Sequence, residues 1–154
     1  MPGPQWPRDP ANSILVAGVP LEMEWEAYGT IYPGDLVEFE TTTCKVKAAQ
    51  ADSNIVVGIA DLAMASITQR GASRDNAYTA GDQVKVISGP IIVMGRIAAS
   101  QDITCGDNLQ PAASGEIKEF VCGTDNACQL IGQALETLSV DTENAQWCLV
   151  RWLR

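Results

Sequence analysis

Apolar and polar residues alternate with a period of two in several parts of the chain. Leu21, Met23 and Trp25 alternate with three glutamates, which predicts a half-buried strand over residues 21–26. Segment 14–17 is continuously apolar, and segment 146–153 is rich in aromatic and β-branched residues, so both are also expected to be strands. These patterns predict an all-β protein.

Three Gly-Asp pairs precede strand-like or extended segments: Gly34-Asp35, Gly81-Asp82 and Gly106-Asp107. Glycine admits the left-handed backbone that a tight turn needs, and we expect each aspartate to accept a hydrogen bond from the main-chain N–H two residues on. Metal ligation by these aspartates is the alternative, but they lack the dense carboxylate spacing of a calcium loop. We therefore interpret the three pairs as turn-forming.

The first and third Gly-Asp pairs head similar halves of the chain. The glycine-broken apolar segment 55–60 puts Gly58 24 residues after Gly34, and segment 129–134 puts Gly132 26 residues after Gly106. A glycine inside such a strand usually marks a bulge or a bend at a barrel corner. The expected fold is a small β-barrel or β-tulip domain.

The two ends of the chain differ in character. Residues 1–13 contain four prolines, which exclude a helix or a central strand, so we expect an extended N-terminal arm whose one large apolar side chain is Trp6. We divide the chain into an arm with the first strand, 1–27, and a barrel domain, 28–154. Segment 61–76 is either a short helix or the end of a strand followed by a loop.

Charge and length exclude several classes of protein. Acidic residues outnumber basic ones 19 to 10, and a formal charge of −9 opposes binding to a phosphate backbone, so we expect no nucleic-acid partner. No apolar run approaches the roughly 20 residues that cross a bilayer, and the N-terminus has no secretory signal. We expect no membrane association, and a protein made in a cytoplasm.

The cysteines and the lack of histidine narrow the chemistry. The five cysteines include no C-x-x-C pair, and the chain has no histidine, which argues against a zinc site and against a serine or cysteine triad. Cys122 and Cys128 can form a hairpin disulfide under oxidising conditions, whereas buried free thiols are the expected state for most of the five.

No nucleotide-binding motif is present, and Glu22, Glu24 and Glu26 form a solvated acidic stripe rather than a catalytic pair. The sequence thus predicts no catalytic, metal or cofactor residues, and no enzyme.

The order of the strand phrases resembles that of the small head decoration, or cement, proteins of tailed viruses. The phrases are Tyr32–Val37, Ile55–Ala60, Tyr78–Val86, Ile103–Leu109 and Leu130–Ala134, and the resemblance covers residues 28–154. It implies a barrel subunit that assembles, commonly as a homotrimer, on the outer face of an icosahedral head and bridges neighbouring capsomers. The implied partner is the major capsid protein, and the implied location is the virion surface after a stage in the host cytoplasm.

Within this hypothesis the apolar residues near the polar arm are candidate contacts with the capsid or with another subunit. They are Trp6, Ile14, Leu15 and Val16. Two other classes of function stay open: a carbohydrate- or surface-binding β-module, in which tryptophans stack on sugar rings, and an all-β hydrolase.

Overall fold

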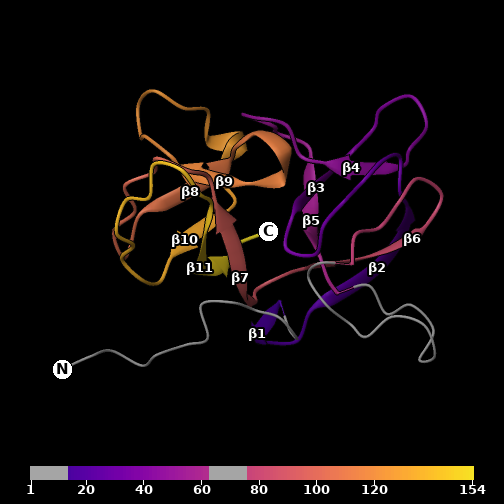
Figure 1. Ribbon diagram of the computed structural model, residues 1–154, viewed down its shortest axis with the longest axis horizontal. Coiled ribbons are helices and arrows are strands. Elements are labelled where there is room, and N and C mark those ends of the chain that lie inside the picture. Colours follow the sequence, from indigo (N-terminus) through magenta and orange to yellow (C-terminus); the bar gives the residue numbers. More distant parts are fainter. Residues whose placement is uncertain (1–13, 63–75) are drawn as a thin grey trace.

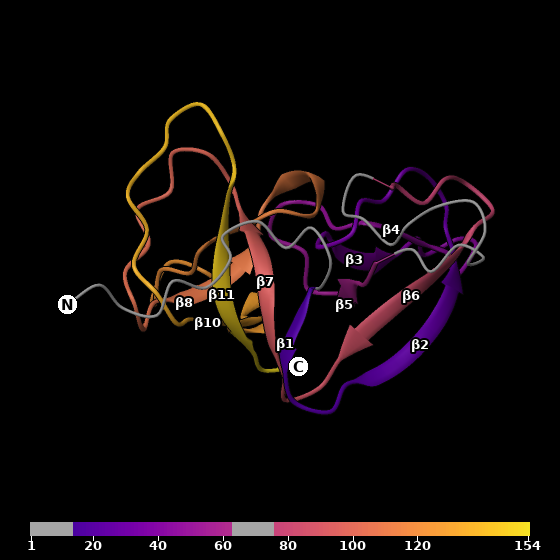
Figure 2. The same ribbon diagram turned by 60° about the horizontal axis from the view of Figure 1, so that its bottom comes forward.

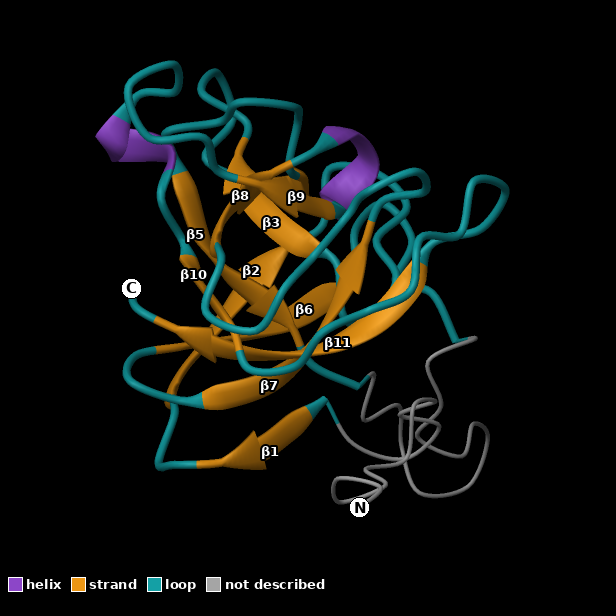
Figure 3. Ribbon diagram, turned by 90° about the vertical axis from the view of Figure 1, so that its left-hand side faces the viewer, coloured by secondary structure: helices purple, strands orange, loops and turns teal. Residues whose placement is uncertain are grey.

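The computed structural model describes residues 14–62 and 76–154. In these ranges the regular structure is β-strand, apart from two short 3-10 helices, Ala113–Gly115 and Ala127–Gln129 (Figure 3). The predicted all-β fold built on a small barrel is confirmed. The arm with Trp6, and most of the ambiguous segment 61–76, lie outside the described residues.

The first half of the chain forms a sheet that curls on itself, here called the N-terminal barrel. Its strands are β2 (Leu21–Glu26), β3 (Leu36–Phe39), β4 (Val46–Ala48), β5 (Val56–Ala60) and β6 (Gln83–Ser88). They follow the order β2-β6-β5-β3-β4, and a parallel bridge between Ala27 and Val46 brings the two ends of the sheet together. The division that the sequence suggested after residue 27 therefore falls inside this barrel.

The second half forms a closed barrel of the same kind, the C-terminal barrel, which lies beside the first (Figure 1). Its strands are β7 (Ile92–Ile97), β8 (Asn108–Pro111), β9 (Ile117–Glu119), β10 (Gly132–Ala134) and β11 (Gln146–Trp152). The order is β7-β11-β10-β8-β9, closed by the parallel pair Ile97↔Ile117. The short strand β1 (Leu15–Ala17) adds to the outside of β7, as Figure 2 shows.

The two barrels share one topology and one register. Leu36 pairs with Ile59 and Ile59 with Ile87 in the N-terminal barrel, and Asn108, Gln133 and Arg151 form the same row in the C-terminal barrel. The halves that the Gly34/Gly58 and Gly106/Gly132 spacings predicted are therefore real structural repeats, related strand by strand from β2 and β7 onward.

The interior residues correspond as well. Each barrel is filled by apolar side chains, most of them from alternate strand positions, which point inward because side chains alternate across a strand. In the N-terminal barrel they are Ala27, Ile31, Val37, Val46, Ala60, Tyr78, Val84 and Val86, and the matching residues of the C-terminal barrel are Ile97, Ile103, Leu109, Ile117, Ala134, Leu138, Cys148 and Val150.

The outer faces of the two barrels differ, and this difference joins them. Leu36, Ile59 and Ile87 point out of the N-terminal barrel and are fully buried in a shared core with residues such as Ile14 and Trp152. The equivalent row of the C-terminal barrel is the polar set Asn108, Gln133 and Arg151, whose residues are exposed or half-exposed. Because one barrel presents an apolar face that the other lacks, the contact between them is not two-fold symmetric.

The three Gly-Asp turns share one geometry, which corrects one detail expected from the sequence. Gly34, Gly81 and Gly106 have φ of 90°, 93° and 99°, the left-handed region that glycine adopts freely. Each aspartate Oδ2 accepts from the N–H three residues earlier, at 2.7–2.9 Å, in Tyr32, Thr79 and Thr104. The expected acceptance from two residues on is wrong, because the turn folds back over the residues that precede the aspartate.

One of these turns allows a direct test. Asp107→Ala is expected to lower the free energy of unfolding by about 1 kcal/mol, the typical worth of one hydrogen bond, because the Thr104 N–H loses its acceptor. Urea denaturation measures the change, with Asp102→Ala as control, since Asp102 is exposed and forms no hydrogen bond within the described residues. Equal stabilities of the two variants would contradict the assigned role of Asp107.

Candidate interaction surface

Exposed apolar side chains gather where the two barrels meet. Val19 is 89% exposed, Leu21 61% and Leu153 46%, and Pro90 lies in the linker between β6 and β7. Leu21 pairs with Ser88, and the Gly89 N–H donates to the Arg154 carbonyl at 2.6 Å, so the segments around residues 18–21, 88–90 and 153–154 are neighbours. We call Val19, Leu21, Pro90 and Leu153 the junction surface.

Close backbone packing holds these segments together. A Cβ at Gly18 would lie 3.0 Å from the Pro90 oxygen and 3.1 Å from the Ile91 Cα, which is tighter than normal contact. Glycine at this position therefore lets the chain between β1 and β2 pass directly over the linker between the barrels. Arg154 lies at the same place, because its carbonyl accepts from the Gly89 N–H of the linker.

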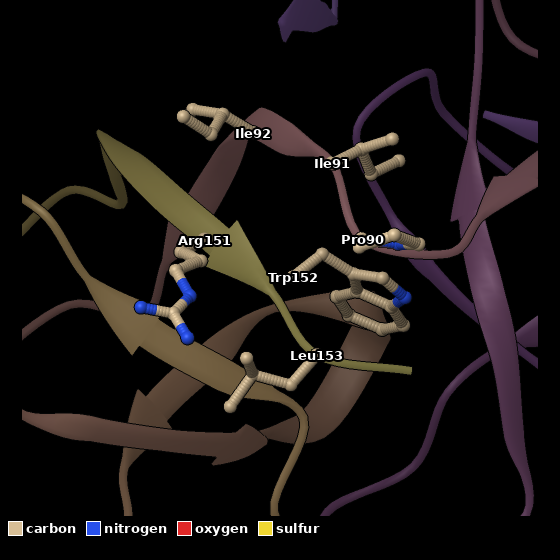
Figure 4. A pocket seen from close by; sticks show the side chains of 6 residues that line it. All are labelled: Pro90, Ile91, Ile92, Arg151, Trp152 and Leu153. Carbon is tan, nitrogen blue, oxygen red and sulfur yellow. The ribbon is translucent and has the colours of Figure 1, made fainter. Parts of the chain in front are cut away.

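A cavity of about 260 Å³ opens beside the junction surface. Figure 4 shows the residues that line it: Pro90, Ile91, Ile92, Arg151, Trp152 and Leu153. Trp152 is 1% exposed, and its indole Nε1 is buried without a hydrogen-bond partner among the described residues. A site of this size holds one side chain of a partner rather than a large ligand, since ligand pockets usually measure ≈ 300–1,000 Å³.

The cavity is bordered by positive charge on a chain of net charge −9. Arg151 lines it without an ion-pair partner in the described ranges, and Arg154 follows Leu153, with its guanidinium donating to the Cys128 carbonyl. This corner of the molecule therefore combines exposed apolar groups with a local cationic rim.

The first Gly-Asp turn lies between the barrels and links them through a buried ion pair. Asp35 is 2% exposed, and its Oδ1 accepts from Arg96 Nη2 at 2.7 Å; Arg96 also donates to the Ser114 carbonyl at 3.1 Å. Gly34 packs against the ring of Trp147, and a Cβ at Gly115 would lie 2.7 Å from the Asp35 Cβ. The turn thus orients one barrel on the other.

The pKa of Asp35 in this ion pair is set mainly by the burial of its carboxyl group. Burial raises the pKa of Asp35 to about 6, although Arg96 and the hydrogen bond from the Tyr32 N–H both lower it. Arg96 Nε also lies 3.7 Å from a Glu116 carboxylate oxygen. A carboxyl with a shifted pKa can mark a catalytic site; Asp35 is enclosed, and its ion pair with Arg96 connects the two barrels.

The other turn residues named from the sequence do not converge on a site. A Cβ added at Gly81 or Gly106 would meet no atom within 4 Å, and Asp82 and Asp107 hold exposed turns on separate barrels. In the parts of the chain that the structure describes, no group of three or more metal-ligating side chains occurs.

The candidate contacts near the arm take different positions. Ile14 is fully buried in the core between the barrels, Leu15 packs partly buried against that core, and Val16 is half-buried on β1. An external partner cannot reach Ile14 in this fold. Trp6 lies outside the described residues.

The cysteines differ from the expectation of buried thiols. Cys148 is buried in the C-terminal barrel, but Cys44, Cys105, Cys122 and Cys128 are exposed, and all five are free. The expected burial is wrong for these four exposed cysteines, because three of them lie in turns and loops and Cys128 lies in a short 3-10 helix. Within the described ranges, no helix is long and apolar enough to span a bilayer.

Sequence reasoning missed Arg96 and the junction surface. Arg96 pairs with a residue 61 positions away, which no local pattern indicates. Val19 lies between Gly18 and Pro20, and Leu153 follows β11. The signal that could have indicated both is a large apolar residue outside the apolar–polar alternation of a strand.

The likeness of this chain to known proteins is found among solved structures. No protein-family model and no curated protein matches the chain. Among solved structures, the N-terminal base of the head fibre gp8.5 of bacteriophage phi29 is similar, with 19% sequence identity and a TM-score of 0.44 over 88% of this chain and 99% of that one.

Proposed function

We propose that the chain is a structural decoration, or cement, protein that binds the outer surface of an icosahedral viral head and stabilises it by bridging capsomers, as a homotrimer. The observation that carries the proposal is the junction surface, an exposed apolar area on an otherwise strongly acidic molecule. Contiguous apolar exposure of this kind marks protein–protein contact sites.

The body behind this surface suits a passive, mechanical role. Two small barrels packed through a shared core and a buried ion pair form a stiff support, and a stiff support loses little entropy on binding. On a symmetric shell, each subunit of a trimer engages its own site, so modest contacts add up through effective concentration.

The sugar-binding alternative gains no support from the tryptophans. Trp152 is buried, Trp147 packs against Gly34 and is partly buried against the shared core, and Trp25 packs edge-on against Phe39 with ring centroids 4.8 Å apart. Of these three rings, Trp152 is enclosed, and Trp25 and Trp147 are partly buried against other side chains.

The test is co-sedimentation with empty heads of the encoding virus, after the mass of the free protein has been measured. Val19→Asp and Leu153→Asp are each expected to weaken binding at least tenfold, because a carboxylate would be desolvated against an apolar partner. Val140→Asp is the matched control, since Val140 is 50% exposed in the loop before β11 and away from the junction. Failure to bind heads, or equal binding of all variants, would refute the proposal.

A further inference from the structure

Because the two barrels are structural repeats, the outer edge of β2 can be compared with the outer edge of β7. β2 and β7 occupy the same place in their barrels, and their pairing with β6 and β11 aligns Glu22, Met23 and Glu24 with Ile92, Val93 and Met94. The outer edge of β7 at these positions is occupied by β1, with Leu15 opposite Val93 and the Met94 N–H donating to the Ile14 carbonyl at 2.9 Å. The C-terminal barrel therefore shows what fits such an edge: a short extended segment.

The corresponding edge of β2 is open in the described part of the chain. β2 pairs with β6 along its whole length, and its other side meets β4 only beyond the strand, at the Ala27↔Val46 bridge. The Ala27 N–H donates toward β6, to Asp82, and the Tyr28 N–H donates the other way, to Val46. Since backbone groups alternate in direction along a strand, the N–H and C=O groups of Glu22 and Glu24 face the open edge.

The inner face of this edge is apolar and incompletely covered. Leu21 is 61% exposed and Met23 and Trp25 are half-buried, whereas the equivalent Ile91 and Val93 of the C-terminal barrel, where β1 pairs with β7, are 2% and 0% exposed. The apolar side chains that are buried where β1 pairs with β7 thus have partly exposed counterparts on β2.

The outer face of the same edge is acidic. Glu22 pairs with Lys85 at 3.0 Å and Glu26 with Lys45 at 2.5 Å, while Glu24, between them, is exposed and forms no ion pair within the described residues. A strand added here would place one set of its side chains over Leu21 and Met23, and the alternate set beside Glu24.

We propose that the free edge of β2 binds an extended segment of another protein in which apolar side chains alternate with lysine or arginine. Backbone hydrogen bonds to Glu22 and Glu24 supply the affinity, as in other strand additions, and the two faces supply the specificity. A second copy of this chain is a poor occupant, because its net charge of −9 repels an acidic edge. The proposed strand site shares Leu21 with the junction surface, but its backbone contacts at Glu22 and Glu24 do not require the role on viral heads.

The experiment uses the full chain and the peptide acetyl-Lys-Val-Lys-Ile-Lys-Val-Lys-amide, with the same peptide carrying glutamate for lysine as control. We expect the lysine peptide to bind at least tenfold more tightly, and to slow hydrogen exchange of the Glu22 and Glu24 amides selectively. Glu24→Pro removes one edge N–H but no bond to β6, and is expected to weaken binding at least tenfold. Asp102→Lys, a charge reversal at an exposed site elsewhere, is expected to leave binding within twofold.

Three results would overturn the proposal. The first is equal binding of both peptides. The second is unchanged binding by a Glu24→Pro variant whose circular dichroism and melting temperature show an intact fold. The third is protection of the Glu22 and Glu24 amides in the free chain: if it is independent of concentration, the chain itself occupies the edge, and if it grows with concentration, a second copy does.

Discussion

Alanine at Gly58 or at Gly132 is expected to lower the free energy of unfolding by about 3 kcal/mol, the upper end of typical overpacking costs. A Cβ at Gly58 would lie 2.5 Å from the Ile87 backbone oxygen and 2.7 Å from Val86 Cγ1. At Gly132 it would lie 2.5 Å from the Arg151 oxygen and 3.1 Å from Val150 Cγ1. Ile87 and Arg151 are equivalent residues of β6 and β11, so the same steric conflict is expected at the same place in both barrels.

The conflict is costly because the obstructing atoms belong to the backbone. A side chain can change rotamer, but a carbonyl in the adjacent strand moves only if the two strands separate, and the barrel closes on itself. Urea denaturation of both variants measures the effect, with Gly29→Ala as control, since no atom lies within 4 Å of its Cβ position. The control is expected to change stability by less than about 0.5 kcal/mol. Tolerance of alanine at both buried glycines would contradict the strand spacing in the barrels.

The local elements of this fold follow from the sequence. The alternation of Leu21, Met23 and Trp25 with glutamates identifies β2, and the Gly34 and Gly106 turns correctly mark the starts of β3 and β8. These signals are readable because turns and strand faces depend on neighbouring residues. The repeat was readable for the same reason, since equivalent turns and glycines recur at matching offsets.

The contacts between residues far apart in the chain could not be predicted from the sequence. The apolar segment 55–60 indicates a strand buried on both faces, but not that Ile59 packs on a second barrel. Asp35 and Asp107 stand in the same local motif, yet only Asp35 is buried, because Arg96 and Gly115 lie against it. Ile14 follows a proline-rich segment and is therefore expected from the sequence to be a contact residue near the arm. It is buried in the core because the adjoining strand β1 pairs with the edge of β7. Each depends on partners that the fold alone brings together.

Replacing Arg96 by methionine is expected to lower the free energy of unfolding by about 3 kcal/mol at pH 8, because it leaves the Asp35 carboxylate buried without its cation. The figure is at the lower end of the range for buried pairs, since the Arg96 side chain is 26% exposed. Denaturation with guanidinium or urea at fixed pH measures the change. Lys118→Met, which removes a half-exposed cation paired with Asp52 at 2.6 Å, is the control and is expected to cost less than about 1 kcal/mol.

The pH dependence of this effect has a definite sign. The pKa of Asp35 is raised from 3.8 to about 6 in the folded protein, so the folded state holds the proton more tightly than the unfolded state does. The contribution of Asp35 to stability is therefore most favourable below about pH 4 and is lost as the pH rises through 6. Without Arg96 the pKa rises further, and the loss extends to higher pH.

It follows that the cost of Arg96→Met should shrink as the solution is acidified, to less than about 1 kcal/mol at pH 4, where Asp35 is protonated with or without its partner. Asp35→Asn isolates the cause, because an amide keeps the shape of the side chain but carries no charge. In that background Arg96→Met should cost little at either pH, and the difference between the two backgrounds gives the coupling of the pair. A cost that is independent of pH, or that persists in the double variant, would mean that Arg96 joins the barrels by packing and by its bond to Ser114 rather than through the charge of Asp35.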